Sequence, residues 1–355
     1  MTSHPIPIGK AARRLALLCA AVFVATACSG SATLAPTTTV ATPNPSATQP
    51  PVEKVTFRLD WVPTGTSAYA YLAVAKGFFT EQGLDVTVEP GQGSKPSIDL
   101  VANGSDTFGS AEGGVVVQAV TQGEKVKMVS STYPAGGNGI LALKSSGITK
   151  PQDLVGKTVG IPTASSAFQL WPAFLAANNI DPNSVKVVNL ASSALVTQLV
   201  AKTVDAVGIY PFSSGAPLDA AGTPTSSFLY SDSGVNTLGL GVIASLSTIQ
   251  AKPDVVRRFV AAIVKAIAYG GAHPDEAAAA LVSLNPDLKL DQAVAQQVWI
   301  RFFAARDTAN TKGHPIGWMA AADWTQTEDL LNKYAALNSN MTIDNFYTND
   351  FLPAQ

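Results

Sequence analysis

The chain has 355 residues, of which 46% are hydrophobic and only 14% charged. It can therefore bury a sizeable core, and its length predicts two domains rather than one. Twenty-three basic residues against 25 acidic ones give a net charge of −2, which offers no basic surface for nucleic acid. The two cysteines, Cys19 and Cys28, both lie near the N-terminus. A disulfide-stapled fold and a cysteine-based site in the rest of the chain are thus excluded.

The N-terminal segment predicts export. Basic residues between positions 10 and 14 precede an apolar run over 15–27, which is shorter than the ~20 residues needed to span a bilayer and typical of a secretory signal. The following Ala25-Thr26-Ala27-Cys28 resembles the lipobox of bacterial lipoproteins. That resemblance implies a signal peptide over 1–27 and a lipid on Cys28; the alternative is a plain secretory signal in which Cys28 is incidental.

Residues 28–52 predict a tether. Positions 29–52 contain no charge and no aromatic residue and are rich in Ser, Thr and Pro, which favours an extended segment over a packed core. The longest later apolar stretch, 255–272, is interrupted by Arg257, Arg258 and Lys265 and so does not predict a membrane span. We therefore expect a protein held at the extracytoplasmic face of the cell membrane through the lipid alone.

From residue 55 the chain alternates strands and helices. In the first series, strands are expected over 55–61, 84–89, 106–111 and 125–132, and helices over 67–78, 98–102 and 114–122. The strands follow a period of two. Such alternation predicts βαβ units and a mainly parallel sheet.

A second series follows a crossover near residue 137. Strands are expected over 139–143, 157–161, 185–190 and 204–210, and helices over 167–178 and 194–202. After a strand at 239–244 the chain turns helical, with apolar residues at helical spacing from Val256 to Ile267 and Pro253 in the first turn. The predicted organisation is 53–137 as the first part of lobe 1, 138–240 as lobe 2, and 241–355 as a return to lobe 1 with C-terminal helices.

No motif of a known catalytic chemistry occurs. A nucleophile elbow, a zinc-protease helix and a phosphate-binding loop are all missing. His273 and His314 are expected in solvated loops, since neither has a second histidine or a cysteine nearby. The sequence therefore implies no cofactor and no metal.

Several segments, in this order, are similar to one group of solute-binding proteins of ABC importers. They are Arg58-Leu-Asp-Trp61-Val-Pro63, Ala73 to Val86, Asp106-Thr-Phe-Gly109-Ser110, Gly147 to Pro162, and Val204-Asp-Ala-Val207. The group serves uptake of thiamine-pyrimidine precursors, sulfonates, nitrate and related small nutrients. The resemblance implies a two-lobed, periplasmic-binding-protein-like α/β fold with the ligand cleft between the lobes. The implied partners are a small-molecule ligand, an ABC permease and its ATPase, and a monomer is expected.

Ligand-binding residues are expected where strands end, because ligands of open α/β sheets bind there. In the first lobe these are Asp60, Trp61, Thr64 and Thr66 after the first strand, and Gly109, Ser110 and Glu112 after the third. Trp61 offers a face for stacking a ring, and the carboxylates favour an amino-bearing ligand. Trp61 packed in the core and Glu112 as an exposed helix-start residue are the alternatives.

The second lobe and the hinge supply the remaining expected contacts. Thr163, Ser165 and Ser166 open a helix whose N–H groups suit an anion or a carbonyl, although Ser165 can equally be only a helix cap. Tyr210 ends a strand and can cover a ring. Tyr133, Asn138 and Tyr230 lie near the crossovers, with hinge packing as their alternative role.

Two classes of function remain, a binding protein and an enzyme. Fungal thiamine-pyrimidine synthases resemble the same group, but they carry a histidine shortly after the Trp-Pro segment and a cysteine-rich iron motif. Here Thr64-Gly-Thr-Ser67 follows that segment and no cysteine follows Cys28, so a non-enzymatic binding protein is expected. An aminopyrimidine thiamine precursor is the favoured ligand, and an alkanesulfonate or taurine, held by hydroxyls such as Thr64, Ser110 and Ser165, is the alternative.

Overall fold

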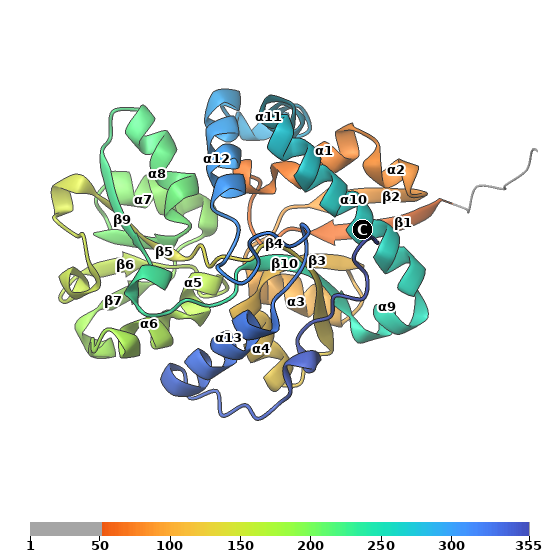
Figure 1. Cartoon of the computed structure of the whole chain (residues 1–355). Coiled ribbons are helices and arrows are strands. Elements are labelled where there is room, and N and C mark those ends of the chain that lie inside the picture. Colours follow the sequence, from red (N-terminus) through yellow and green to blue (C-terminus); the bar gives the residue numbers. More distant parts are fainter. Residues whose placement is uncertain (1–51, 355) are drawn as a thin grey trace, which may run out of the picture. The chain divides into compact units, whose positions relative to one another are not determined.

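Two five-stranded sheets organise residues 52–354, the part of the chain that the computed structural model describes (Figure 1). The predicted signal peptide, Cys28 and most of the predicted tether lie outside the described residues. The first-lobe sheet has the order β2-β1-β3-β10-β4, and the second-lobe sheet has the order β7-β6-β8-β5-β9. The predicted α/β class is thus confirmed.

The strands of the first lobe are β1 (Glu53–Arg58), β2 (Leu84–Glu89), β3 (Phe108–Glu112), β4 (Val126–Tyr133) and β10 (Leu240–Ser245). Those of the second lobe are β5 (Gly139–Leu143), β6 (Thr158–Gly160), β7 (Lys186–Val188), β8 (Ala206–Ile209) and β9 (Thr225–Leu229). In each sheet four strands run in one direction, and only β10 or β5 runs against its two neighbours. Both exceptions are the strands that enter their sheet from the other lobe.

Helices flank both sheets. Those of the first lobe are α1 (Ala68–Ala75), α2 (Phe78–Glu81), α3 (Ser94–Ala102) and α4 (Gly113–Thr121), and those of the second are α5 (Ser166–Gln169), α6 (Trp171–Ala177), α7 (Leu195–Val200) and α8 (Pro211–Ala220). The C-terminal helices are α9 (Leu246–Ala251), α10 (Pro253–Ala272), α11 (Pro274–Ser283), α12 (Gln292–Ala304) and α13 (Ala321–Tyr334). No helix within residues 52–354 has the length and apolar character that crossing a membrane requires.

The C-terminal helices contact both lobes. α10 and α11 pack on α1, and Phe259 of α10 stacks on Phe108 of β3 with ring centroids 4.0 Å apart. α12 packs against α8, and α13 packs against both α4 and α6. These helices therefore complete the core of the first lobe and also brace the second.

Two antiparallel segments connect the lobes, residues 134–138 and 230–239. The Gly239 N–H donates to the carbonyl of Pro134 over 2.9 Å, and the Tyr230 N–H donates to the carbonyl of Asn138 over 2.9 Å. At Gly239 a Cβ atom would lie 2.1 Å from the carbonyl oxygen of Ala135, so glycine permits this close approach. The crossing segments thus form a paired hinge beside the site described below.

Candidate functional site

A cavity lies where the ends of strands from both sheets meet. Its wall is formed by the loop after β1, the crossing segments with the start of β10, the start of α5 and the β8–α8 junction. The lining residues are Asp60, Trp61, Thr64, Thr66, Asn138, Ser165, Ser166, Ala167, Gly208, Ile209, Tyr210, Ser213 and Leu240. The space open to the centres of water molecules is about 40 Å³. A single water needs about 10–15 Å³ by this measure. The cavity therefore suits a small, ring-sized molecule.

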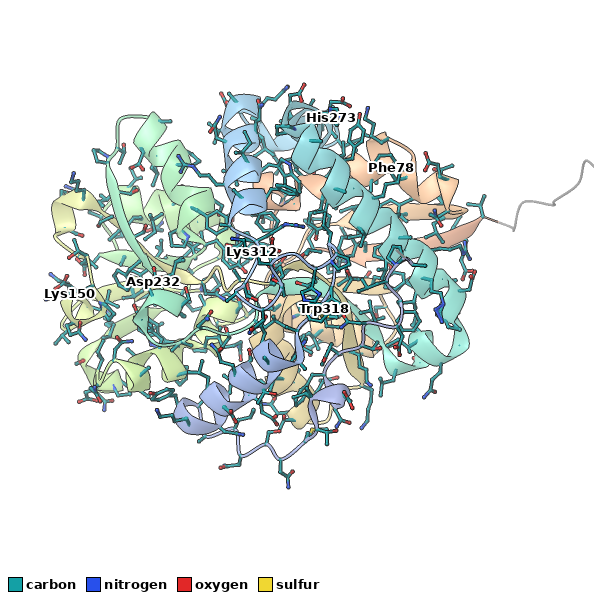
Figure 2. All side chains as sticks on the ribbon, viewed as in Figure 1. Phe78, Lys150, Asp232, His273, Lys312 and Trp318 are labelled. Atoms are coloured by element: carbon teal, nitrogen blue, oxygen red, sulfur yellow. The ribbon has the colours of Figure 1, made fainter. Side chains whose placement is uncertain are left out.

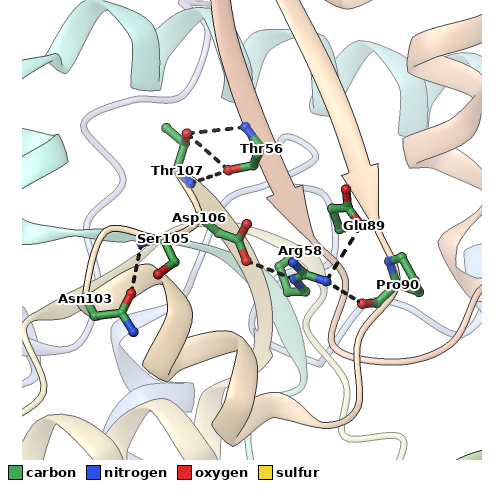
Figure 3. Close-up of polar contacts among 8 residues, drawn as sticks. All are labelled: Thr56, Arg58, Glu89, Pro90, Asn103, Ser105, Asp106 and Thr107. Carbon is green, nitrogen blue, oxygen red and sulfur yellow. Dashed lines mark hydrogen bonds and ion pairs between the residues drawn. The ribbon is translucent and has the colours of Figure 1, made fainter.

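Arg58 fixes the strand end from which the first-lobe wall begins. Its Nε donates to Oδ2 of Asp106 over 2.9 Å and its Nη1 to the carbonyl of Pro90 over 2.9 Å (Figure 3). Next to this pair the Thr107 N–H donates to Oγ1 of Thr56 over 2.8 Å, again between β1 and the chain entering β3 (Figure 3). Arg58 is thus occupied within the first lobe, and its charge is not offered to the cavity.

Asp60 brings a half-buried carboxyl to the cavity. The Ser110 hydroxyl donates to its Oδ1 over 3.2 Å. Burial raises the pKa of Asp60 from 3.8 to about 6, against the opposing effect of hydrogen bonds from its own backbone and from Ser110. At neutral pH Asp60 is therefore mostly ionised and presents one negative charge.

Glu112 lies deeper, at the end of β3 opposite Leu240. Its side chain has no exposed surface, and neither carboxyl oxygen has a hydrogen-bond partner among the residues that the structure describes. Burial, followed by the charge of Asp60, raises its pKa well above the ordinary value of 4.5. The sequence-based alternative of an exposed glutamate at the start of a helix is therefore wrong.

The second lobe contributes polar groups without charge. The Ser166 hydroxyl donates to Oδ1 of Asn138 over 2.8 Å, while Nδ2 of Asn138 and the hydroxyl of Tyr210 are buried and have no partner within residues 52–354. The ring of Tyr210 packs against Gly137, where a Cβ atom would lie 2.6 Å from it. One amide donor and one phenol group are thus left for a ligand.

Ser165 acts as a helix cap. Its Oγ accepts the N–H of Phe168 over 3.2 Å and donates to the carbonyl of Pro162 over 2.7 Å. The helix it caps, α5, has only four residues. The longer helix predicted from the sequence is interrupted at Leu170, and α6 begins at Trp171 with Pro172 in its first turn. Ser165 borders the cavity, but its hydroxyl is already used.

Eight of the 14 residues predicted to bind ligand line the cavity, namely Asp60, Trp61, Thr64, Thr66, Asn138, Ser165, Ser166 and Tyr210. Ser110 and Glu112 lie behind Asp60. Thr163 instead lines a neighbouring depression with Val62 and Asn189.

Three others have packing roles. Gly109 lies so close to α3 that a Cβ atom would be 2.5 Å from Oγ of Ser97. Tyr133 stacks on Phe302 with centroids 4.5 Å apart. Tyr230 stacks on Phe174 at 4.4 Å and donates its hydroxyl proton to the carbonyl of Ala167 over 3.2 Å.

Five lining residues were not predicted: Ala167, Gly208, Ile209, Ser213 and Leu240. Four of them are apolar or lack a side chain and carry no chemical signal in a sequence. Ser213 follows Tyr210 by three residues, in the first turn of a helix that the sequence analysis did not predict.

The two lobes touch on both sides of the cavity wall. Trp61, from the first lobe, packs against the second-lobe apolar cluster that includes Ile209. Gly93, from the loop before α3, meets the backbone of Ala164, where a Cβ atom on Gly93 would lie 2.1 Å from the Ala164 carbonyl oxygen. The cavity is therefore bounded by direct contacts between the lobes.

No lining residue is basic, and within residues 52–354 no group of acidic, histidine or cysteine side chains could hold a metal ion. The histidines lie elsewhere. His273, labelled in Figure 2, stacks on Tyr269 at the end of α10. His314 stacks on Trp318, which is also labelled there. The cavity thus offers stacking faces, hydroxyl and amide groups, and negative charge only.

Two α/β lobes, a paired hinge and an interlobe cavity define the architecture of solute-binding proteins of importers. The chain belongs to the family described as NMT1/THI5 like, whose profile matches residues 65–277, more than half of its length.

Curated relatives cover nearly the whole chain. It is 26% identical to the riboflavin-binding protein RibY of Chloroflexus aurantiacus over 94% of this chain and 95% of the relative. It is 24% identical to the formylaminopyrimidine-binding protein of Halalkalibacterium halodurans, over 84% of this chain and 90% of the relative. It is also 26% identical to a 4-amino-5-hydroxymethyl-2-methylpyrimidine phosphate synthase of Legionella pneumophila, over 84% and 92%.

Solved structures agree on the fold. A protein from Bordetella bronchiseptica superposes with a TM-score of 0.70 at 21% identity, covering 84% of this chain and 95% of that one. The alkanesulfonate-binding protein SsuA of Xanthomonas axonopodis, bound to MOPS, superposes with a TM-score of 0.65 at 17% identity, covering 84% of this chain and 99% of that one. The periplasmic-binding-protein-like fold expected from the sequence is confirmed.

Proposed function

We propose that this protein captures a planar, amino-bearing heterocycle of the aminopyrimidine type in the interlobe cavity and delivers it to an ABC permease. The observation that carries the proposal is the charge of the site: the Asp60 carboxyl lines the cavity, Glu112 is buried next to Asp60, and no lining residue is basic. A buried negative group favours N–H donors and repels anions, because charges interact strongly at low dielectric.

The flat faces and the free polar atoms support the same ligand class. Trp61 and Tyr210 both line the cavity and can contact a ring through their faces. Asn138 and Tyr210 each keep one buried group without a partner, and native proteins seldom leave such groups unpaired. A ring with an amino group and acceptor atoms would satisfy them.

The alkanesulfonate alternative fits less well. A sulfonate needs N–H or cationic partners, but Arg58 is paired with Asp106 and the Ser165 hydroxyl already caps α5. The Asp60 carboxylate at the cavity would oppose its charge. The named sulfonate binder shares the fold at 17% identity, and fold alone does not carry its ligand.

Riboflavin, the ligand named for the relative from Chloroflexus aurantiacus, is a planar heterocycle with N–H and carbonyl groups. Its fused three-ring system is larger than the single substituted ring that we propose, and it shares with that ring a flat face and N–H groups. Riboflavin therefore belongs in the test as the competing ligand.

We further propose that the protein acts without catalysis, exported and anchored by a lipid on Cys28. The site offers no histidine, cysteine or metal cluster among its described residues, although relatives named as synthases exist. The run Ala25-Thr26-Ala27-Cys28 and the uncharged segment after it supply the anchor and tether.

Thermal unfolding with added ligands tests the proposed function. The panel is 4-amino-5-hydroxymethyl-2-methylpyrimidine, riboflavin, an alkanesulfonate and nitrate. A ligand at a hundred times its dissociation constant adds about 2.7 kcal/mol to the free energy of unfolding. We expect this for the aminopyrimidine; stabilisation by the sulfonate or nitrate alone would overturn the assignment.

A further inference from the structure

Glu112 is the one acidic side chain within residues 52–354 that has neither exposed surface nor a hydrogen-bond partner for either carboxyl oxygen. Placing such a group away from water costs several kcal/mol when nothing pairs with it. A buried polar group left in this state therefore needs an explanation. The function proposed above depends on the charge of the site but gives the Glu112 carboxyl no partner.

The described groups around Glu112 make no hydrogen bond to its carboxyl. Asp60, after β1, is a like charge that raises the pKa of Glu112. Burial, followed by the charge of Glu112, raises the pKa of Tyr133 at the end of β4. Tyr69 of α1 faces Asp60 in the same cluster, and α3 contributes the Ser94 hydroxyl, which accepts the backbone N–H of Glu112. β10 contributes apolar Leu240, and no described basic side chain acts on either carboxyl.

Burial, followed by the charge of Asp60, raises the pKa of Glu112 well above 4.5 and so favours the uncharged form of its carboxyl. An uncharged carboxyl has one O–H donor and one carbonyl acceptor side by side. It can therefore pair with a molecular edge that presents an acceptor atom next to an N–H group. A sulfonate or nitrate has acceptor atoms only and cannot complete this pair.

We propose that Glu112 is a ligand-contacting residue of the interlobe site, and that its buried, unpartnered carboxyl pairs with a ligand edge in which an N–H group lies beside an acceptor atom. This inference rests on the proposed function and sharpens it. Aminopyrimidines present such an edge, with an exocyclic amino group next to a ring nitrogen, and so does the carbonyl–N–H edge of a flavin.

The location of Glu112 adds a requirement for entry. Its carboxyl has no exposed surface while Gly93 touches Ala164 and Trp61 packs against the second lobe. A ligand must therefore reach Glu112 before the lobes come into contact. Leu240, opposite Glu112 and part of the cavity wall, marks the side from which it would approach.

The test compares wild type, Glu112→Gln and Glu112→Leu by calorimetric titration with 4-amino-5-hydroxymethyl-2-methylpyrimidine and with riboflavin. The carboxamide of Gln keeps a donor and an acceptor in place, so Glu112→Gln should bind within about threefold of wild type at pH 7. Glu112→Leu keeps bulk but loses both groups, so its affinity should fall at least tenfold. Its thermal midpoint without ligand should nevertheless rise, which separates lost contact from misfolding.

A pH series gives the second readout. Wild-type affinity should fall as the pH rises and Glu112 loses its proton, whereas Glu112→Gln should show no such decline. Unchanged affinity in Glu112→Leu, or the same decline in Glu112→Gln, would overturn the role of Glu112 while leaving the proposed function standing. Wild type that binds neither ligand would overturn both.

Discussion

The Ser110 hydroxyl donates a hydrogen bond of 3.2 Å to Oδ1 of Asp60, joining the end of β3 to the loop after β1 at the wall of the cavity. This bond holds the carboxylate in place, but it is weaker than the effect of burial, since the pKa of Asp60 still rises to about 6. The protein therefore keeps a carboxyl whose ionisation opposes folding. Function at the expense of stability is common at binding sites.

Replacing that carboxyl should stabilise the empty protein. The folded-state pKa of about 6 lies above the ordinary 3.8, so folded protein holds a proton that unfolded protein releases between pH 4 and 6. Stability from this group is present at low pH and is lost as pH rises through about 6. Asp60→Asn should remove this decrease of stability with rising pH, and it should raise the free energy of unfolding at pH 7 by about 1–3 kcal/mol.

Denaturant unfolding between pH 4 and 8 measures this effect. Asp99→Asn is the control, because Asp99 is an exposed partner of Lys95 on α3. The account would be contradicted if Asp60→Asn had the wild-type dependence of the free energy of unfolding on pH and a lower free energy of unfolding at pH 7.

Two tyrosines allow a matched comparison of binding and packing roles. In the described part of the chain, the hydroxyl of Tyr210 is buried without a partner, while that of Tyr230 donates to the carbonyl of Ala167. Tyr210→Phe should lower ligand affinity about three- to tenfold and leave the empty protein as stable as before or more so. Tyr230→Phe should cost about 1 kcal/mol of stability and leave affinity unchanged. The reverse pattern in titration and thermal unfolding would show that the cavity lies elsewhere.

A substitution at Gly93 should hold the lobes apart. A Cβ atom there would lie 2.1 Å from the carbonyl oxygen of Ala164, and the φ angle of 141° disfavours other residues. Gly93→Ala should reduce ligand affinity at least tenfold and increase the radius of gyration measured by X-ray scattering with ligand present. The control is Gly123→Ala, since Gly123 has a φ of 107° but open space around it. Equal affinity in the two variants would show that this contact does not accompany binding.

Removing the indole of Trp61 tests the stacking face. Trp61 lines the cavity and also packs against the second lobe. Trp61→Ala should weaken binding of an aminopyrimidine at least tenfold, because it removes both the aromatic face and a contact made when the lobes meet. Trp318→Ala is the control, since Trp318 stacks on His314 and does not line the cavity. Equal titration curves for Trp61→Ala and wild type would remove the aminopyrimidine assignment.

Strongly patterned elements could be predicted from the sequence. The alternating segment Leu84–Glu89 and the apolar run Gly139–Leu143 are strands with the predicted bounds, because helices pack on the faces that the pattern marks. The helix expected over 67–78 instead ends at Ala75, since Gly77 takes a φ of 71° before α2 begins. The expected strand 55–61 ends at Arg58, where the chain turns into the cavity.

Elements without such a pattern were missed. α8 contains Gly215 and Pro217, residues that disfavour a helix, and depends on packing against β9 and α12. β9 is a half-buried edge strand rich in serine and threonine. Tertiary contacts rather than local preference form both elements.

For the site, the sequence identified strand ends but not side-chain direction. Asp60, Trp61 and Tyr210 meet at one cavity because each follows a parallel strand of its sheet. Tyr230 also borders a crossover, yet it turns into the second-lobe core against Phe174. A sequence does not distinguish these directions, since both sides of the hinge segment border buried space.

Calorimetric titration with two ligands that differ by a single amino group tests the ligand assignment most directly. The pair is 4-amino-5-hydroxymethyl-2-methylpyrimidine and 5-hydroxymethyl-2-methylpyrimidine, measured on the wild-type protein at pH 7. A site that pairs buried carboxyls with an amino group discriminates strongly against a ligand lacking it, so the amino compound should bind at least a hundredfold more tightly. Equal affinities, or binding of neither compound while an alkanesulfonate binds, would contradict recognition of an amino-bearing ring at Asp60.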